Sequence, residues 1–377
     1  MPVPIEQRSS TIPMTSPLQS RCWAEIDLAA LRQNVTALRH RSGSARLLAV
    51  VKADAYGHGL AEVAKTLQSC GVDAFAIANP SEALALRAVV GPNPFILLFG
   101  AAFPFEIETL LTHNITPTIT TLAEAQRLAA AARRRVDVHV KIDTGMGRVG
   151  FWHVEAGAAL QQIAALPQLQ IAGVYTHFPV ADENLPETRR QLERFLTVTR
   201  GYPMRHAANS AAILTLPEAI LDMVRPGLAL YGVAPGAADF QPVLTFKSLV
   251  AHVKTVAAGR TISYGQTFVA PAPMRIATVA AGYADGFSRQ LSNKAAVLIA
   301  GHRCRVVGRV TMDQIMVDVT HVPEVRCGAE VVFIGRQGPA TITATEVAEW
   351  QGTIAWEVLC GIPKTPRVPR RYRDVSA

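Results

Sequence analysis

From about residue 45 to residue 225, short apolar runs alternate with longer amphipathic stretches, and this repetition most limits how the chain can fold. Short apolar runs bounded by turn residues indicate buried strands, and the stretches between them have helical spacing. The alternation therefore predicts βα units arranged around a parallel sheet. The candidate strands are 47–51, 73–77, 95–99, 116–119, 136–142, 171–176, 204–207 and 221–224.

Eight such strands predict a closed (β/α)8 barrel over residues 23–245, with a doubly wound open sheet as the alternative. After residue 245 the runs become short and β-branched, and glycine, proline or asparagine separates them. This pattern predicts a second, mostly β domain over residues 246–377, with one short helix at 345–350. The candidate strands are 250–256, 275–280, 296–299, 305–310, 315–319 and 331–334. Residues 1–22 are expected to form an N-terminal arm associated with that domain.

Composition excludes several classes of protein. Of the 377 residues, 49% are hydrophobic and 18% are charged, so the chain can bury a large core and is not disordered. The net charge is +8, but the basic residues are scattered without interleaved aromatics, which argues against a nucleic-acid partner. The five cysteines contain no C-x-x-C pair, which argues against a zinc site or a disulfide framework. Without a signal-peptide core or a membrane-length apolar run, a soluble cytoplasmic protein with no membrane partner is expected.

Lys52 directly follows the first apolar run and begins the string Lys-Ala-Asp-Ala-Tyr-Gly-His-Gly. In a barrel, the carboxyl ends of the strands carry the active site, and a desolvated lysine there can act as a nucleophilic amine. A solvated lysine at a strand end is the alternative. The glycines beside Tyr56 and His58 favour the first interpretation, because they indicate a tight loop that holds two polar rings near the amine.

A second group of candidates follows the seventh and eighth strands, where barrels frequently bind phosphate. Ser210 is predicted to open a helix, and Gly227 can bring its backbone close to a ligand. An ordinary helix cap at Ser210 and an ordinary turn at Gly227 are the alternatives. A nucleophilic lysine facing a phosphate site indicates pyridoxal phosphate, whose phosphate anchors the cofactor while the amine holds its aldehyde.

With these residues in place, the sequence resembles the alanine racemases, a family of pyridoxal-phosphate enzymes of fold type III. The family's motifs occur here in their usual order between residues 23 and 319, at 51–59, 141–148, 175–178, 209–210, 225–232, 263–265, 282–286 and 311–314. Each motif alone is loose, but the ordered set is specific. The resemblance implies interconversion of L- and D-alanine by a homodimer with shared active sites.

The resemblance also implies a role for each matching residue. Lys52 would hold the cofactor as an imine and act as one base, while Tyr264 from the second subunit would act as the other base. His177 would lie at the cofactor and hydrogen-bond that tyrosine, and Arg225 would meet the pyridine nitrogen. The other implied contacts are Tyr56, Asn209, Ser210, Gly227 and Leu228 for the cofactor, and Arg148, Met312 and Tyr283 for the substrate.

The chemistry agrees with this assignment. Racemisation through an external aldimine needs one proton-transfer group on each face of the α-carbon, because a single group cannot reach both. Arginine has no proton to spare, so Arg225 would leave the ring nitrogen unprotonated and disfavour a long-lived carbanion. His177 with Asp182 and Glu183 could indicate a metal cluster, but cysteine partners and H-x-x-x-H spacing are missing, so no metal is expected.

Three other functions remain as alternatives. A racemase of broader specificity would accept serine as well as alanine. A non-catalytic pyridoxal-phosphate-binding protein shares a related barrel but lacks a β domain, and decarboxylases of basic amino acids carry other motifs. The physiological role, either supply of D-alanine for peptidoglycan or breakdown of alanine, does not follow from the sequence.

The sequence departs from the family near its end. The family usually has a phosphate-contacting tyrosine just before an Arg-Val-Pro-Arg string, whereas Pro366 stands there in this chain and Tyr372 lies further on. An apparent short insertion accompanies the change. The residue that replaces the family's tyrosine at the rim of the pocket is therefore not identified.

Lys141 ends a predicted barrel strand and precedes Arg148 by seven residues. Both faces of a barrel strand are largely buried, and a buried ammonium close to an arginine is unfavourable. A neutral amine, a nearby carboxylate such as Asp143, or carbamylation by carbon dioxide would each resolve the conflict. The resemblance favours a carbamate, which would hold Arg148 through two hydrogen bonds.

Overall fold

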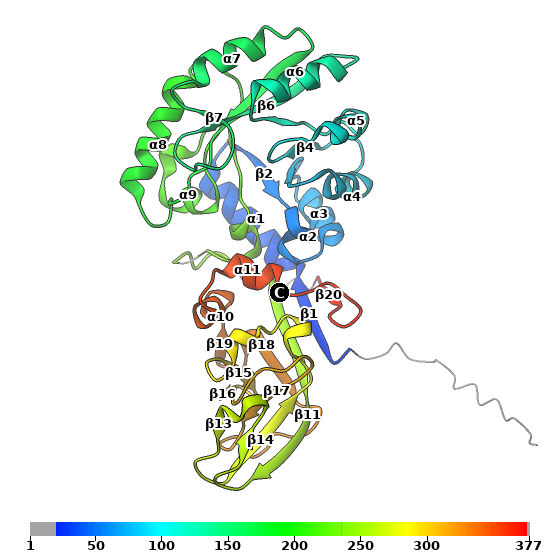
Figure 1. Ribbon diagram of the computed structural model, residues 1–377, viewed down its shortest axis with the longest axis vertical. Coiled ribbons are helices and arrows are strands. Elements are labelled where there is room, and N and C mark those ends of the chain that lie inside the picture. Colours follow the sequence, from blue (N-terminus) through cyan, green and yellow to red (C-terminus); the bar gives the residue numbers. More distant parts are fainter. Residues whose placement is uncertain (1–19, 235, 375–377) are drawn as a thin grey trace, which may run out of the picture.

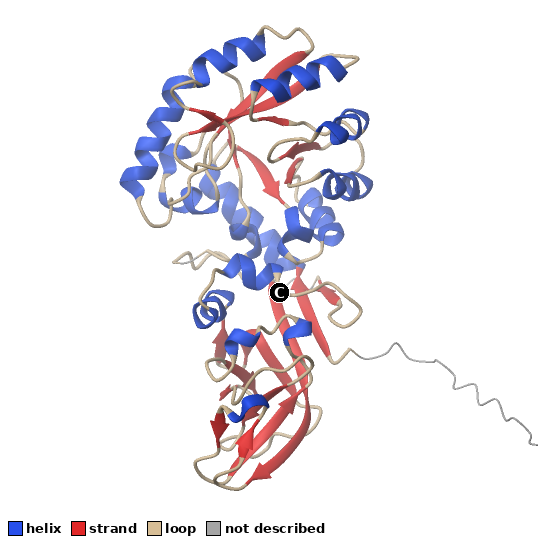
Figure 2. Cartoon of the chain, in the orientation of Figure 1, coloured by secondary structure: helices blue, strands red, loops and turns tan. Residues whose placement is uncertain are grey.

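The computed structural model describes residues 20–234 and 236–374. An α/β barrel forms one end of the molecule and a strand-rich domain forms the other (Figure 1). Helices surround the strands of the barrel, whereas strands dominate the second domain (Figure 2). The predicted fold class is confirmed. Most of the predicted N-terminal arm lies outside the described residues.

Eight parallel strands form the barrel, and the alternative of an open sheet is wrong. The strands form two sheets, which single bridges join at Leu97–Thr116 and at Asn209–Arg225. These bridges close the ring because they lie between the last strand of one sheet and the first of the other. The barrel strands are β2 (Arg46–Val50), β3 (Ala74–Ile77), β4 (Phe95–Leu98), β5 (Thr118–Ile119), β6 (Val136–Asp143), β8 (Leu169–Tyr175), β9 (Arg205–His206) and β10 (Met223–Val224). The short strand β7 (Phe151–Trp152) adds to β6.

Helices between these strands begin at residues that cap them well. The Asn79 side chain accepts a hydrogen bond from the backbone of α4, and proline follows at the first helical position. Thr121 and Glu124 form a capping box at the start of α6. The helices are α1 (Leu28–Ser42), α3 (Leu60–Ser69), α4 (Pro80–Val90), α5 (Ile107–Thr112), α6 (Leu122–Ala131), α7 (Ala156–Ala164), α8 (Leu185–Val198) and α9 (Ser210–Thr215). No helix within residues 20–234 or 236–374 is both long and apolar enough to cross a membrane.

The long strand β11 (Leu244–Val256) organises the second domain. It pairs antiparallel with β1 (Cys22–Asp27), β14 (Met274–Val279) and β18 (Glu330–Gln337). The other elements are β12 (Thr261–Ile262), β13 (Phe268–Val269), β15 (Ala296–Ile299), β16 (His302–Arg305), β17 (Ile315–Asp318), β19 (Ala340–Ile342), α10 (Ala344–Gln351), α11 (Ala355–Cys360) and β20 (Arg370–Arg373). The strand predicted at 305–310 is wrong, since the strand there ends at Arg305.

The first strand corrects the predicted start of the barrel. We expected the barrel to begin at residue 23, but β1 lies in the sheet of the second domain, between β11 and β20. The barrel therefore begins at Leu28, the first residue of α1. Five buried residues in a row let β1 fit inside a sheet that is covered on both faces.

Candidate active site

Lys52 lies at the mouth of the barrel, on the short element α2 (Lys52–Tyr56) that directly follows β2. The next four residues, from Ala53 to Tyr56, all have left-handed φ angles between 52° and 56°. This conformation costs roughly 1–2 kcal/mol for each residue that has a Cβ. Backbone hydrogen bonds from Gly57 to Ala53 and from Gly59 to Asp54, both 2.9 Å, close the turn. We call residues 52–59 the lysine turn.

The surroundings of Lys52 favour a neutral amine. The side chain is half-buried, and this burial lowers the pKa of Lys52. The positive charge of Arg148 lowers the pKa further, while Glu82 acts in the opposite sense. Glu82 is itself fixed, because its Oε1 accepts a hydrogen bond of 2.8 Å from the backbone of Ala53 in the lysine turn.

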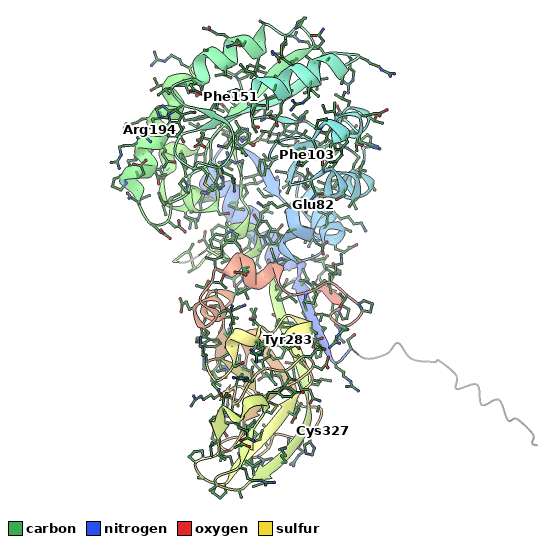
Figure 3. The ribbon with its side chains drawn as sticks, in the orientation of Figure 1. Glu82, Phe103, Phe151, Arg194, Tyr283 and Cys327 are labelled. Carbon is green, nitrogen blue, oxygen red and sulfur yellow. The ribbon has the colours of Figure 1, made fainter. Side chains whose placement is uncertain are left out.

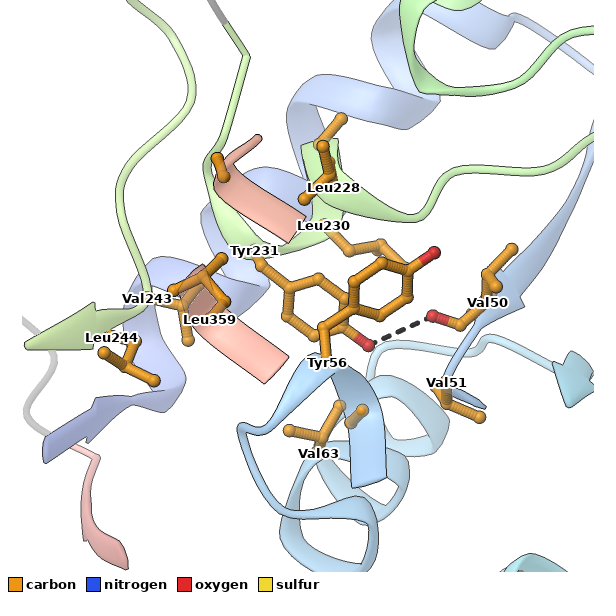
Figure 4. Packing of buried hydrophobic residues seen from close by; sticks show 14 of the residues in the cluster. Val50, Val51, Tyr56, Val63, Leu228, Leu230, Tyr231, Val243, Leu244 and Leu359 are labelled. Carbon is orange, nitrogen blue, oxygen red and sulfur yellow. Dashed lines mark hydrogen bonds between the residues drawn. The ribbon is translucent and has the colours of Figure 1, made fainter. Parts of the chain in front are cut away.

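Tyr56, the last residue of α2, faces the loop after β10. Its ring packs beside Tyr231, with 5.2 Å between the ring centroids, and Leu228 lies close by (Figure 4). The Tyr231 hydroxyl donates a hydrogen bond of 3.1 Å to the carbonyl of Val50. A Cβ atom added to Gly227 would lie 2.8 Å from the Tyr56 hydroxyl, so only glycine leaves this space open.

Ser210 connects the two loops predicted to hold phosphate. Its Oγ accepts hydrogen bonds from the backbone of Gly227 at 2.9 Å and of Ala229 at 3.2 Å. Asn209 is the cap of α9, since its Oδ1 accepts a bond from Ala212, and its amide also donates to the carbonyl of Phe178. Ser210 thus opens α9 as predicted, and the alternative of an ordinary helix cap applies to Asn209.

Arg225 is buried and makes four hydrogen bonds. Its Nη2 donates to the carbonyls of Thr176 at 2.6 Å and Ala207 at 2.8 Å, and to His177 Nδ1 at 3.5 Å. Its Nη1 donates to His206 Nδ1 at 3.2 Å. Burial lowers the pKa of Arg225 to about 10 and the pKa of His177 to well below its ordinary value. At neutral pH, a charged guanidinium therefore lies beside a neutral imidazole.

The sequence did not predict that two buried histidines, His206 and His139, would form a hydrogen-bonded chain that begins at Arg225. Since arginine can only donate, His206 must accept through Nδ1 and carry its proton on Nε2. That Nε2 lies 2.8 Å from Nδ1 of His139, which therefore accepts. Burial lowers the pKa of both rings. Alternation along β6 puts His139 on the same face as Lys141, and this was the available signal.

Lys141 is buried at 2% exposure, and its Nζ donates to the carbonyl of Ile142 at 2.9 Å. The Asp143 carboxylate accepts bonds from the backbones of Gly145 and Gly147, both at 2.9 Å, so it caps its own loop. Burial lowers the pKa of Lys141 to about 7, against the opposing charge of Asp143. Arg148 is exposed on the loop that follows β6 and also lowers the pKa of Lys141.

Three of the predicted site residues lie on the second domain and not on the barrel. Tyr264, Tyr283 and Met312 are 71%, 43% and 52% exposed. Backbone hydrogen bonds from Tyr283 to Thr311 and from Ala284 to Met312 join two of their loops. Tyr283 lies in the strand-rich domain, away from Glu82 in the barrel (Figure 3). Within the described residues, no hydrogen bond links these three side chains to the barrel.

The predicted site residues thus form two groups in one chain. The barrel brings together Lys52, Tyr56, Lys141, Arg148, His177, Asn209, Ser210, Arg225, Gly227 and Leu228. The second domain carries Tyr264, Tyr283 and Met312 as the exposed group. Tyr372, the tyrosine near the chain end, packs its hydroxyl against Gly59 of the lysine turn, and burial raises its pKa to about 12.

Two family models cover the chain almost from end to end. "Alanine racemase, N-terminal domain" matches residues 26–235 and "Alanine racemase, C-terminal domain" matches residues 243–372. The chain belongs to the alanine racemase family. An alanine racemase of Symbiobacterium thermophilum is 45% identical over 94% of this chain and 98% of that protein. One of Halothermothrix orenii is 42% identical over 93% of this chain and 97% of that protein.

Solved alanine racemases also share the architecture. The alanine racemase of Clostridium difficile 630 has a TM-score of 0.87 at 36% identity, over 95% of this chain and 97% of that one. The enzyme from a Streptomyces lavendulae that produces D-cycloserine has a TM-score of 0.86 at 37% identity, over 96% and 99% of the two chains. Both the barrel and the β domain are therefore shared with this family.

Alanine racemases depend on pyridoxal phosphate, and the barrel residues fit that group. Lys52 supplies an amine with a lowered pKa, and Arg225 supplies a buried cation. Gly227 leaves open a space that a Cβ would fill beside the Tyr56 hydroxyl. Within residues 20–234 and 236–374, no three His, Cys, Asp or Glu side chains are grouped so that they could hold a metal ion.

Proposed function

We propose that this chain is an alanine racemase that interconverts L- and D-alanine with bound pyridoxal phosphate. One observation carries the proposal. Lys52, whose pKa is lowered, and Tyr56 are the first and last residues of α2 at the barrel mouth, and Tyr56 faces Gly227 in the loop predicted to hold phosphate. Relatives named alanine racemase that match almost the whole chain support the same activity.

When bound, pyridoxal phosphate would withdraw electrons from the α-carbon of alanine and make its hydrogen acidic. Lys52 would hold the cofactor through its amine and then exchange a proton with one face of the α-carbon. A lowered pKa suits both tasks, because a neutral amine is the nucleophile and the base. Ser210, Gly227, Leu228, Asn209 and Tyr56 would surround the phosphate.

Arg225 would donate to the pyridine nitrogen. It is held by the carbonyls of Thr176 and Ala207 and by two histidines, so it cannot swing away from the barrel centre. Because a guanidinium stays charged at neutral pH even when burial lowers its pKa to about 10, it would not pass a proton to the ring. His177 would bridge Arg225 and the second base.

Tyr264 of a second subunit would be the base on the opposite face. In a single chain this tyrosine is 71% exposed and makes no hydrogen bond to the barrel within the described residues. Tyr283 and Met312 are exposed on the same domain, so a second barrel mouth placed over them would cover all three. We infer a homodimer in which each site takes Lys52 from one subunit and Tyr264 from the other.

Arg148 and the backbone at Met312 would bind the substrate carboxylate, with Tyr283 at the entrance. Lys141 would carry a carbamate that orients Arg148. The neutral form of the amine adds to carbon dioxide and loses one proton, and a pKa of about 7 makes that form abundant near neutral pH. The carbamate would accept two hydrogen bonds from the guanidinium.

The purified protein should convert L-alanine to D-alanine, measured by chiral chromatography, and the rate should depend on pyridoxal phosphate. After borohydride reduction, peptide mapping should find the pyridoxyl label on Lys52. Label on Lys65, Lys141 or Lys247 would contradict the role of Lys52. A protein that binds the cofactor but makes no D-alanine would contradict the racemase activity.

A further inference from the structure

Arg370 lies near the end of the chain, at the start of β20, but its guanidinium reaches the lysine turn. The Nε atom donates a hydrogen bond of 2.7 Å to the carbonyl of Gly57. The other donors bind the segment that precedes β20, namely the carbonyls of Pro363 at 2.9 Å, Val368 at 3.0 Å and Ile362 at 2.7 Å. One side chain therefore ties the last segment of the chain to the turn.

The lysine turn depends on support from outside its own backbone. Its four left-handed residues carry a Cβ, so the conformation is sterically unfavourable unless the surroundings hold it. Gly57 ends the run, and its carbonyl is the group that Arg370 binds. A charged donor makes a stronger hydrogen bond than a neutral one, so this contact is well suited to hold the turn.

Two more contacts join the same parts of the chain. The carbonyl of Leu359 lies so close to Gly57 that a Cβ there would be 2.6 Å from it. Lys364, in the segment that precedes β20, pairs with Asp54 of the turn at 3.3 Å. Residues 359–370 therefore contact the turn at several points, and the Arg370 guanidinium links the carbonyl of Ile362 to that of Gly57.

We propose that Arg370 is a positioning residue for the reaction. By binding the Gly57 carbonyl it holds the left-handed turn, and the turn sets the spacing between Lys52 and Tyr56, the first and last residues of α2. These two residues are the proposed holders of the amine end and the phosphate end of one cofactor. The inference thus rests on the role proposed for Lys52.

Arg371 offers a matched control. It is the next residue on β20, but its guanidinium stacks on Trp23, 4.2 Å from the ring centroid, and makes no hydrogen bond to the turn. Substitution of either arginine removes one positive charge from the same strand. Only the Arg370 substitution releases the Gly57 carbonyl.

The first test is hydrogen exchange of the cofactor-free protein, followed by mass spectrometry. Arg370→Ala should speed exchange in peptides that cover residues 53–59 roughly tenfold, relative to peptides from β6 and β8. Arg371→Ala should leave these peptides unchanged. Equal exchange in the turn for the two variants would overturn the proposal, and this readout does not depend on activity.

The second test separates positioning from folding. Arg370→Lys keeps a charge but cannot make the forked set of hydrogen bonds, so it should lie between wild type and alanine, and it replaces the alanine variant if that one fails to fold. Both variants should weaken pyridoxal phosphate binding and lower kcat more than they raise KM for alanine. A lower Tm with unchanged cofactor affinity and unchanged kcat would overturn the inference. Borohydride label away from Lys52 would instead overturn the proposed function.

Discussion

Lys141 Nζ donates its hydrogen bond to the carbonyl of Ile142, and the neighbouring Asp143 carboxylate is occupied by its own loop. A neutral amine, an ion pair with Asp143 and a carbamate were the three ways to accommodate a buried lysine at this position. The ion pair with Asp143 is therefore the least supported of them. The lowered pKa leaves a neutral amine that can react with carbon dioxide.

We predict a carbamate on Lys141. Protein exchanged into ¹³C-labelled carbonate should show a carbamate resonance by NMR, and Lys141→Ala should abolish it. That variant should also bind alanine poorly and recover with added chloride or short carboxylic acids, which would fill the vacated anion position. A signal that persists in Lys141→Ala but disappears in a variant of an exposed lysine, such as Lys254→Ala, would refute the assignment.

Without carbon dioxide, Lys141 should make folding stability depend on pH. The pKa of this lysine falls from 10.5 to about 7 on folding, so between these values the unfolded chain binds the proton and the folded chain does not. The contribution of Lys141 to the free energy of unfolding therefore rises as the pH increases from about 7 to 10.5. Lys141→Met should stabilise the protein most below pH 7, and the gain should shrink toward pH 10.5.

Urea unfolding of the cofactor-free protein in carbonate-free buffer would measure this trend. Lys254→Met, at an exposed position on β11, serves as the control for the loss of a surface lysine. A stability difference between Lys141→Met and wild type that stays constant with pH would show that burial does not shift the titration of this amine.

Gly227→Ala should weaken the binding of pyridoxal phosphate. The new Cβ would lie 2.8 Å from the Tyr56 hydroxyl and 3.3 Å from its ring carbon Cζ. Overpacking of this kind costs about 1–3 kcal/mol, which corresponds to roughly 5- to 140-fold in affinity. Adding Tyr56→Phe should restore part of the lost cofactor affinity, because it removes the hydroxyl oxygen that lies nearest to the new Cβ. Gly157→Ala, where no atom lies within 4 Å, should leave cofactor titrations unchanged.

Tyr264→Phe should keep the visible absorbance of the bound cofactor but lower racemisation by about 10²–10⁴-fold or more, since it removes one proton-transfer group. Mixing it with Lys52→Ala should restore partial activity, because one of the two mixed sites would carry both intact residues. Mass spectrometry of the mixture would verify subunit exchange. Persistent inactivity after that exchange would argue against shared sites.

The barrel was predictable because each of its strands is a local apolar run, and the helices between them start at recognisable caps. The site residues were predictable as motifs at strand ends. The left-handed turn after Lys52 was not, since Ala53 and Ala55 carry a Cβ that disfavours this conformation. It depends on contacts such as the one from Arg370, which lies 313 residues from Gly57 in the sequence.

Pairing between strands that are far apart in the sequence explains the other differences between the predicted and the observed structure. The residues of β1 pair with residues 244–248, more than 200 positions later, so no local pattern could assign the strand to the second domain. The strand β20 is short and rich in arginine, which hides it from a search for apolar runs. His139 and His206 come from β6 and β9, and only the pairing of both strands with β8 brings the two rings together.

The pairing of β1 with β11 makes the whole barrel an insertion into a β-hairpin. The backbone of Asp27 donates a hydrogen bond of 2.9 Å to the carbonyl of Val243, so the points where the chain leaves and rejoins the sheet are adjacent. A fragment cut at residue 243 would lose β1 and expose the edges of β11 and β20 to association with other chains. A tight turn joining Asp27 directly to Val243 would instead excise the barrel and leave the hairpin intact.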